Sequence, residues 1–154
     1  MSEAIRLLRG DEYDEFLAHA LVQYADDMIR AGIDADAARA KSERDHAALL
    51  PDGVDTAGHS LYAILDGDTR VGYLWLAERE SEMGRNLFVY GIQVDESHRG
   101  RGLGRAAMVF AEEEARRRGL PRIALNVFGG NDVARALYAS LGYRETAIYM
   151  EKAL

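Results

Sequence analysis

A glycine-rich loop that carries several arginines is the segment of this sequence best suited to chemistry. It runs from Val94 to Gly104 with the sequence VDESHRGRGLG, between a run of strand character and a run of helix character. Glycine lets a backbone approach a ligand closely, and the unpaired amides of a helix's first turn attract phosphate oxygens. Arg99, Arg101 and Arg105 add positive charge to the same turn. These residue types and this spacing predict a binding site for a phosphate-bearing ligand.

Two common phosphate-binding loops do not fit the spacing. A Walker loop ends in Gly-Lys-Ser/Thr, whereas the corresponding residues here are Gly104, Arg105 and Ala106. A dinucleotide fingerprint that started at Gly100 would need its third glycine where Arg105 stands, and this loop lies too late in the chain for a leading βαβ unit. The spacing therefore disfavours a nucleotide-binding oxidoreductase.

The pattern that fits is Arg-x-x-Gly-x-Gly, filled by Arg99, Gly102 and Gly104. At these residues the chain resembles the GNAT superfamily of acyl-CoA-dependent N-acetyltransferases. A second group of residues is similar to the family's closing strand, helix and strand: Leu125, Val127, Asn131, Ala134, Leu137, Tyr138, Leu141, Gly142 and Tyr143. The two motifs cover residues 87–150 in the family's order, whereas the first half of the chain matches only in its order of elements.

The resemblance implies that acetyl-CoA is the acyl donor and assigns residues to it. The pantetheine arm would pair with the backbone of Ile92 and Val94, and Gly91 supports this geometry because glycine inside a strand marks a bulge or a close approach. An ordinary packing position is the other interpretation of Gly91. Asn131 is similar to the family's pantetheine-contacting asparagine, and a plain helix cap explains it equally well. The pyrophosphate would contact seven consecutive residues: Arg99, Gly100, Arg101, Gly102, Leu103, Gly104 and Arg105.

Tyr138 is the residue to which the resemblance gives a catalytic role. Acyl transfer to an amine expels a thiolate, and a nearby hydroxyl can donate a proton to it. Without the resemblance, the helical spacing of Tyr138 with Ala134, Leu137 and Leu141 would indicate a core tyrosine.

A general base is not assignable from the sequence. The strand before the loop, LFVYGIQV, contains no carboxylate, so Tyr90, Gln93 and Glu78 remain as candidates beside a chain of water molecules. Glu78 also fits a solvated surface position. Glu96 stands where proline is common in the family, which affects the entry angle of the loop but not its glycine spacing.

The elements around these residues are predicted from hydrophobic periodicity and turn signals. Strands are expected at residues 4–9, 60–65, 70–77, 87–94, 122–127 and 143–152. Helices are expected between residues 11 and 32 with Asp11 as cap, between 34 and 50, between 103 and 118, and between 131 and 141. We therefore expect one α/β (α+β) domain over residues 1–154, with a mixed, mostly antiparallel central sheet flanked by helices.

The composition of the chain excludes several kinds of site and partner. The chain has no cysteine, which excludes disulfides and an acyl-cysteine intermediate, and its four histidines lack the spacing of metal ligands. No apolar run approaches the roughly 20 residues of a membrane span, so a cytoplasmic protein is expected. The net charge of -7 argues against nucleic acid as a partner.

The excess negative charge lies in the first 59 residues, which hold 13 acidic and 6 basic side chains. It favours a cationic acceptor, although solvated helix faces explain it as well. The sequence thus predicts direct transfer of an acetyl group from acetyl-CoA to a primary amine of a small molecule, without a metal, by a monomer or homodimer. A non-catalytic acyl-CoA-binding sensor or interaction domain of the same fold is the alternative.

Overall fold

A five-stranded mixed sheet forms the centre of the computed structural model, which describes residues 4–154. Neighbouring strands follow chain order and are antiparallel except β4 and β5, which are parallel. The predicted fold class is therefore confirmed. The strands are β1 (Ile5–Leu7), β2 (His59–Asp66), β3 (Thr69–Ser81), β4 (Gly84–Val94) and β5 (Ile123–Leu125).

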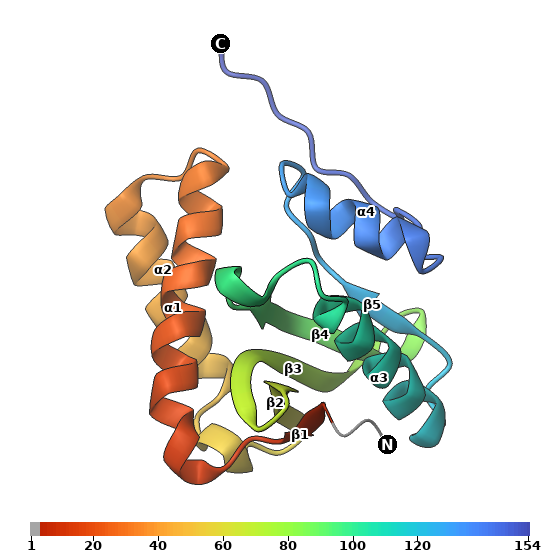
Figure 1. The fold of residues 1–154 in the computed structure, drawn as a ribbon. Helices are drawn as coiled ribbons and strands as arrows, with labels where there is room; N and C mark the ends of the chain where they lie inside the picture. Colours follow the sequence, from red (N-terminus) through yellow and green to blue (C-terminus); the bar gives the residue numbers. More distant parts are fainter. Residues whose placement is uncertain (1–3) are drawn as a thin grey trace.

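Four helices cover the two faces of this sheet (Figure 1). Phe16 of the first helix packs with Tyr73 and Trp75 on one face, whereas Met108 and Tyr138 belong to the core on the other face. The predicted helices are all present, because their apolar positions recur every three or four residues and so form one buried stripe. They are α1 (Tyr13–Arg30), α2 (Ala35–Leu49), α3 (Leu103–Arg117) and α4 (Asp132–Ser140).

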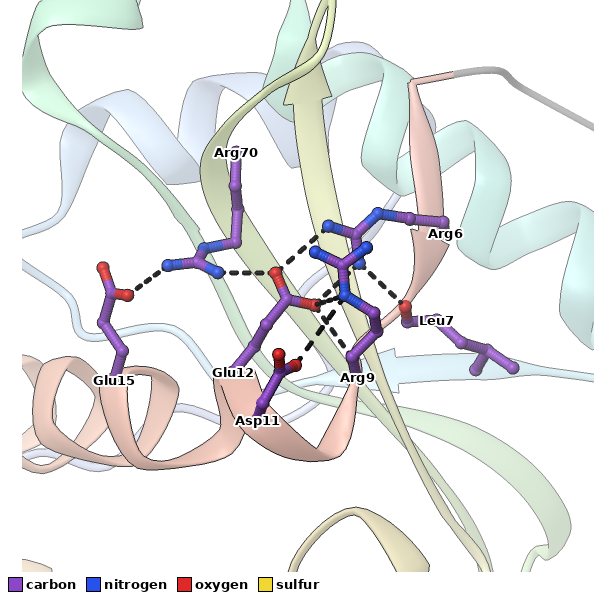
Figure 2. Close-up of polar contacts among 7 residues, drawn as sticks. All are labelled: Arg6, Leu7, Arg9, Asp11, Glu12, Glu15 and Arg70. Atoms are coloured by element: carbon purple, nitrogen blue, oxygen red, sulfur yellow. Dashed lines mark hydrogen bonds and ion pairs between the residues drawn. The ribbon is translucent and has the colours of Figure 1, made fainter.

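A buried carboxylate fixes the start of α1 against the sheet. Glu12 is 6% exposed and accepts hydrogen bonds from Arg6 at 2.7 Å, from Arg70 at 2.6 Å and from the amide of Arg9 at 2.9 Å (Figure 2). The prediction that Asp11 caps this helix was therefore wrong. The reason is that a short 3-10 turn, Gly10–Glu12, precedes α1, and Glu12 rather than Asp11 bonds back to the chain.

The register between β3 and β4 shifts by one residue beside Trp75. Trp75 pairs with Gly91 and Leu76 pairs with Val89, which leaves Tyr90 as an extra residue in β4. A bulge of this kind bends its strand. Beyond it β5 no longer accompanies β4, because the β4–β5 pairs end at Val89 and Leu125. Ile92 and Val94 therefore pair with β3 alone.

The predicted closing strand at residues 143–152 is absent, so that prediction was wrong. After Gly142, which has a φ of +92°, the chain from Tyr143 to Leu154 has no regular secondary structure. Its side chains include exposed apolar groups such as Ile148 and Met150. The pattern of β-forming residues is present, but a strand also needs a hydrogen-bonded neighbour, and none lies beside it in the described chain.

The hairpin of β3 and β4 is longer than predicted. Both strands continue past the apolar alternation into Glu80 and Arg85, which are exposed and pair across the ladder. Hydrophobic patterning ended the predicted strands early because this part of the hairpin faces solvent on both sides. None of the helices in residues 4–154 is long and apolar enough to cross a membrane.

Candidate active site

The predicted anion-binding loop connects the end of β4 to the start of α3. Gly100 and Gly102 have φ values of +78° and +79°, in the left-handed region that favours glycine. The helix ladder of α3 begins with the amide of Ala106, which donates to the carbonyl of Gly102. Within the described residues, the amides of Leu103, Gly104 and Arg105 therefore have no acceptor, and the first turn carries no acidic side chain. This arrangement attracts an anion.

The three arginines of the loop tie it to different elements. The Nε of Arg99 donates to the carbonyl of Val94 at 3.0 Å, Arg101 pairs with Asp66 at 3.0 Å, and Arg105 donates to Ser140 Oγ at 2.7 Å. All three side chains are exposed, so their remaining N–H groups are open to a ligand. The carbonyl of Val94, which the resemblance assigns to the pantetheine arm, is thus held by Arg99 here.

A cavity of about 570 Å³ lies beside the bulge of β4. One half is formed by the strands that diverge at the bulge and by α4, and it includes Ile92, Asn131 and Tyr138; we name it the donor half, because the resemblance implies that these residues contact the acyl donor. The other half, named the acceptor half, is formed by α1, α2 and aromatic side chains of the sheet. Of the predicted site residues, the structure thus brings Ile92, Asn131 and Tyr138 together. Val94 and the loop from Arg99 to Arg105 lie outside the cavity lining, at the end of β4.

Tyr138 combines burial with an unpaired hydroxyl. The residue is 9% exposed, and its hydroxyl makes no hydrogen bond within the described chain. Burial raises the pKa of this phenol above its ordinary value, which keeps the proton on the oxygen at neutral pH. The ring belongs to the core, so the packing interpretation holds, but its oxygen is available to a ligand in the cavity.

Asn131 is a helix cap in this structure. Its side-chain oxygen accepts a hydrogen bond from the amide of Ala134 at 3.2 Å, at the start of α4. It also lines the cavity, so capping and contact with a ligand are compatible. Gly91 lies at the bulge, and a side chain there would meet no protein atom within 4 Å. The bulge interpretation is therefore confirmed, and packing against protein atoms does not account for this glycine.

Aromatic side chains of the sheet, among them Trp75, Phe88 and Tyr90, form a wall of the cavity. Trp75 and Tyr90 stack with ring centroids 4.8 Å apart, and His59 stacks on Tyr90 at 5.6 Å. The indole N–H of Trp75 donates to Nδ1 of His59 at 2.9 Å, and burial lowers the pKa of that imidazole. The guanidinium of Arg79 covers the ring of Phe88 at 4.2 Å. A flat wall of this kind suits an apolar or aromatic part of a ligand.

Two carboxylates stand at the far end of the cavity. Asp45 accepts hydrogen bonds from Lys41 at 2.8 Å and Tyr24 at 3.2 Å, and the Lys41 ammonium lowers the pKa of that carboxyl. Asp27 accepts from Gln23 and Arg30. All these bonds reach only one oxygen of each carboxylate, so Oδ1 of Asp45 and Oδ2 of Asp27 accept none within the described chain. Each carboxylate therefore keeps one unengaged oxygen, while it is ion-paired with Lys41 (Asp45) or Arg30 (Asp27).

Sequence analysis missed His46, because an isolated histidine on a polar helix has no motif. His46 is 6% exposed and lines the cavity beside Trp75, with ring centroids 5.6 Å apart. Its Nδ1 lies 2.8 Å from the carbonyl of Ser42, which can only accept, so Nδ1 carries the proton. In the neutral ring Nε2 is then an acceptor, and it has no hydrogen-bond partner in the described chain.

Of the three side chains that sequence analysis named as possible general bases, two line the cavity and one does not. Tyr90 and Gln93 line the cavity. Glu78 does not, because it forms ion pairs with Arg85 at 3.0 Å and with Arg118 at 3.5 Å. A structural role explains Glu78 without a part in the cavity.

Comparisons with known proteins agree with this architecture. The family model of the acetyltransferase (GNAT) family matches residues 23–143. YdgE, an uncharacterised N-acetyltransferase of Bacillus subtilis (strain 168), is 33% identical, with 100% of this chain and 99% of YdgE covered. The crystal structure of the putative acetyltransferase YycN from Bacillus subtilis superposes with a TM-score of 0.88 and 31% identity, over 97% of this chain and 98% of that one. A GCN5-related N-acetyltransferase from Ralstonia eutropha JMP134 shares the fold, with a TM-score of 0.76 and 24% identity over 97% of each chain.

Proposed function

The chain belongs to the acetyltransferase (GNAT) family, and from that membership we propose that it transfers the acetyl group of acetyl-CoA directly to a primary amine of a small cationic acceptor. The observation that carries the proposal is one continuous cavity. It joins a donor half beside the divergent strands to an acceptor half with aromatic rings and carboxylates. We treat residues 1–154 as one catalytic domain, and a cytoplasmic location stays a prediction.

The donor half fits coenzyme A in two respects. Free amides of Leu103, Gly104 and Arg105, with no acid in the first turn of α3, offer a cradle for the pyrophosphate. The backbone of β4 beyond the bulge lacks its β5 neighbour, which leaves Ile92 open to strand-like pairing with the pantetheine arm. Bound there, acetyl-CoA supplies an activated acetyl thioester. When the pantetheine arm pairs with Val94, the side chain of Arg99 gives up its hydrogen bond to the carbonyl of Val94 or shares that carbonyl with the arm.

Tyr138 is the proposed proton donor. When the amine nitrogen forms its bond to the acetyl carbon, the carbon–sulfur bond breaks and the sulfur leaves as a thiolate, which needs a proton. The Tyr138 hydroxyl has no hydrogen-bond partner within the described chain, and because burial raises its pKa the phenol is protonated at neutral pH. A hydroxyl that lines the cavity is positioned to donate it.

The acceptor half sets the class of amine that we propose. The carboxylates of Asp27 and Asp45 each offer one unengaged oxygen to a cation, and the stack of Trp75 on Tyr90 offers an apolar wall. Hydrogen bonds from an ammonium to a carboxylate are among the stronger ones in proteins. An acceptor with a second positive charge and an apolar body therefore fits better than an anionic one.

The amine that reacts must lose a proton, and we assign its removal to His46. In the neutral imidazole the single proton lies on Nδ1, which donates to the carbonyl of Ser42, so Nε2 carries the lone pair, and the side chain lines the acceptor half. The proton passes to Nε2 directly or through one water molecule. Of the other predicted candidates in the cavity, Gln93 has no ionisable group and Tyr90 presents a phenol that donates a hydrogen bond, so neither offers a free ring nitrogen as His46 does.

A screen of amines tests this function. Thiol release from acetyl-CoA is measured with cationic, neutral and anionic amines at low salt, and binding of acetyl-CoA and of NAD is measured by calorimetry. We expect acetyl-CoA to bind, NAD not to bind, and cationic amines with an apolar body to be acetylated fastest. Acetyl-CoA binding without turnover on any amine would instead favour the sensor domain.

A further inference from the structure

Arg79 brings a positive charge to the wall of the cavity, and no carboxylate of residues 4–154 pairs with it. The side chain lines the cavity beside the aromatic rings of the sheet. Its guanidinium carbon lies 4.2 Å from the ring centroid of Phe88 and 5.7 Å from that of Tyr90. Within the described chain the guanidinium makes no ion pair and no hydrogen bond, so the two rings are what hold it. Its N–H groups are therefore open to a ligand.

The acidic residues next to Arg79 in sequence do not neutralise it. Side chains alternate between the faces of a strand, so Glu78 and Glu80 point away from the face of β3 that carries Arg79. Glu78 is also engaged in ion pairs of its own. The residue that pairs with Arg79 across the ladder is Asn86, which is uncharged. The local sequence thus supplies Arg79 with no counter-ion, and none is contributed from elsewhere in residues 4–154.

The other charges of the cavity lie at some distance from Arg79. Arg79 follows Trp75 by four residues in β3, so about 13 Å separate their Cα atoms. Trp75 in turn contacts the imidazole of His46, which is preceded in α2 by Asp45. The stacked rings of Trp75 and Tyr90 therefore lie between the guanidinium at one end and the imidazole and carboxylate at the other. A ligand that spans the acceptor half meets groups of opposite charge at its two ends.

We propose that Arg79 binds a carboxylate of the acceptor, which makes the acceptor a linear molecule with its reacting amine and second positive charge near one end and a carboxylate at the other. This inference rests on the proposed function and narrows its substrate class. A guanidinium that lies over a ring keeps the N–H groups in its own plane free, and a carboxylate can accept two of them at once. Arg79 is then a specificity-determining residue rather than part of the packing of Phe88.

The spacing favours a short peptide with a free carboxyl terminus and a basic first residue. A chain of three amino acids spans at most about 10 Å, which is the scale of the aromatic wall. In this arrangement the amino terminus lies at His46, the basic side chain reaches toward Asp45, and the terminal carboxylate meets Arg79. Such a peptide carries two positive charges and one negative charge, so it is still a cationic acceptor.

Two peptides that differ in a single group test the inference. Lysyl-glycyl-glycine and its carboxyl-terminal amide have the same amines and the same length, but only the free acid has a carboxylate. Their affinities are measured by calorimetry in the presence of excess CoA. We expect the free acid to bind about tenfold more tightly than the amide at low salt, because the carboxylate forms charge-assisted hydrogen bonds. The preference should shrink as salt is added.

Arg79→Gln should abolish this preference. The ratio of the two affinities should fall to about one, while the affinity for the amide and for acetyl-CoA stays near that of the parent. Arg85→Gln is the matched control, since Arg85 is exposed in the same hairpin but pairs with Glu78 at 3.0 Å and lies outside the cavity lining. It should keep the parent's ratio. A purely structural role of Arg79 on the Phe88 ring would weaken binding of both peptides alike and leave the ratio unchanged.

The inference is overturned if neither peptide binds, if the parent binds acid and amide equally, or if the preference survives in Arg79→Gln. Thiol release from acetyl-CoA with the same two peptides tests the proposed function separately. Preferential binding of the acid through Arg79 without any acetylation would leave the Arg79 site standing and contradict acetyl transfer. Acetylation of cationic amines with equal kcat/KM for acid and amide would keep the proposed function and remove Arg79 from acceptor recognition.

Discussion

The indole of Trp75 stacks on the phenol of Tyr90 with ring centroids 4.8 Å and planes 25° apart. Tyr90 is the extra residue of the β4 bulge, and Trp75 faces that bulge from β3. The bulge at Tyr90 therefore shapes both halves of the cavity. It places an aromatic wall in the acceptor half, and it separates β4 from β5 in the donor half.

Asp45→Asn tests the acceptor half. It keeps the shape of the side chain and removes its charge, so the KM of a cationic acceptor should rise about tenfold while the Kd of acetyl-CoA stays unchanged. The effect should shrink as salt is added, because screening weakens the lost attraction. Asp36→Asn is the control on the same helix, since Asp36 is exposed and outside the cavity. Equal KM values in the two variants would remove Asp45 from the acceptor site.

Gly102→Val tests the anion-binding loop. Gly102 and Gly119 stand at opposite ends of α3, with φ values of +79° and +68°, and neither has an atom within 4 Å of a built side chain. Valine is strained at both positions, so both variants should lose a similar amount of stability, about 1–2 kcal/mol. Only Gly102→Val should weaken acetyl-CoA binding, by about tenfold or more in calorimetry. Similar affinities in both folded proteins would contradict the assignment.

Tyr138→Phe tests the proton donor. The ring and its packing remain, but the hydroxyl is lost, so kcat should fall by about 10² to 10⁴ with little change in acetyl-CoA affinity or Tm. Tyr143→Phe is the matched control. Its ring lies 5.8 Å from that of Tyr138, but its hydroxyl donates to Glu112 at 3.2 Å and serves structure. If the kcat of Tyr138→Phe stays within a few-fold of the parent value, Tyr138 is not the proton donor and solvent takes that role.

Glu12→Gln tests the charged cluster at the start of α1. The guanidinium of Arg6 holds the pKa of Glu12 well below its ordinary value of 4.5, so its ionised form stabilises the fold above that value and the benefit is lost as pH falls. Unfolding by urea should show a loss of about 3 kcal/mol at pH 7. Below about pH 4 the difference in the free energy of unfolding between Glu12→Gln and the parent should narrow, because the carboxylate of the parent takes up a proton when the chain unfolds. The control Glu82→Gln, in the exposed β3–β4 turn, should change neither the free energy of unfolding at pH 7 nor its dependence on pH.

The sequence predicted the elements and the loop more successfully than the cavity. Glycine spacing and helix periodicity are local, which is why the loop around Gly102 and all four helices could be placed. The position of the bulge at Tyr90 depends on register against β3, which only pairing reveals. His46 and Glu12 acquire their surroundings from segments far away in sequence, such as Trp75 and Arg70. The prediction of a closing strand at residues 143–152 was wrong for the same reason, because a strand forms only beside a hydrogen-bonded neighbouring strand.

The most direct test of the account follows a labelled acetyl group from acetyl-CoA. The enzyme, acetyl-CoA with an isotope-labelled acetyl group and the best amine of the screen are incubated together, and the amine, the protein and free acetate are analysed by mass spectrometry. Direct transfer predicts labelled N-acetyl amine in an amount equal to the CoA released, with no label on the protein and none released when the amine is left out. Label on the protein, or label recovered as acetate whether or not the amine is present, would contradict it.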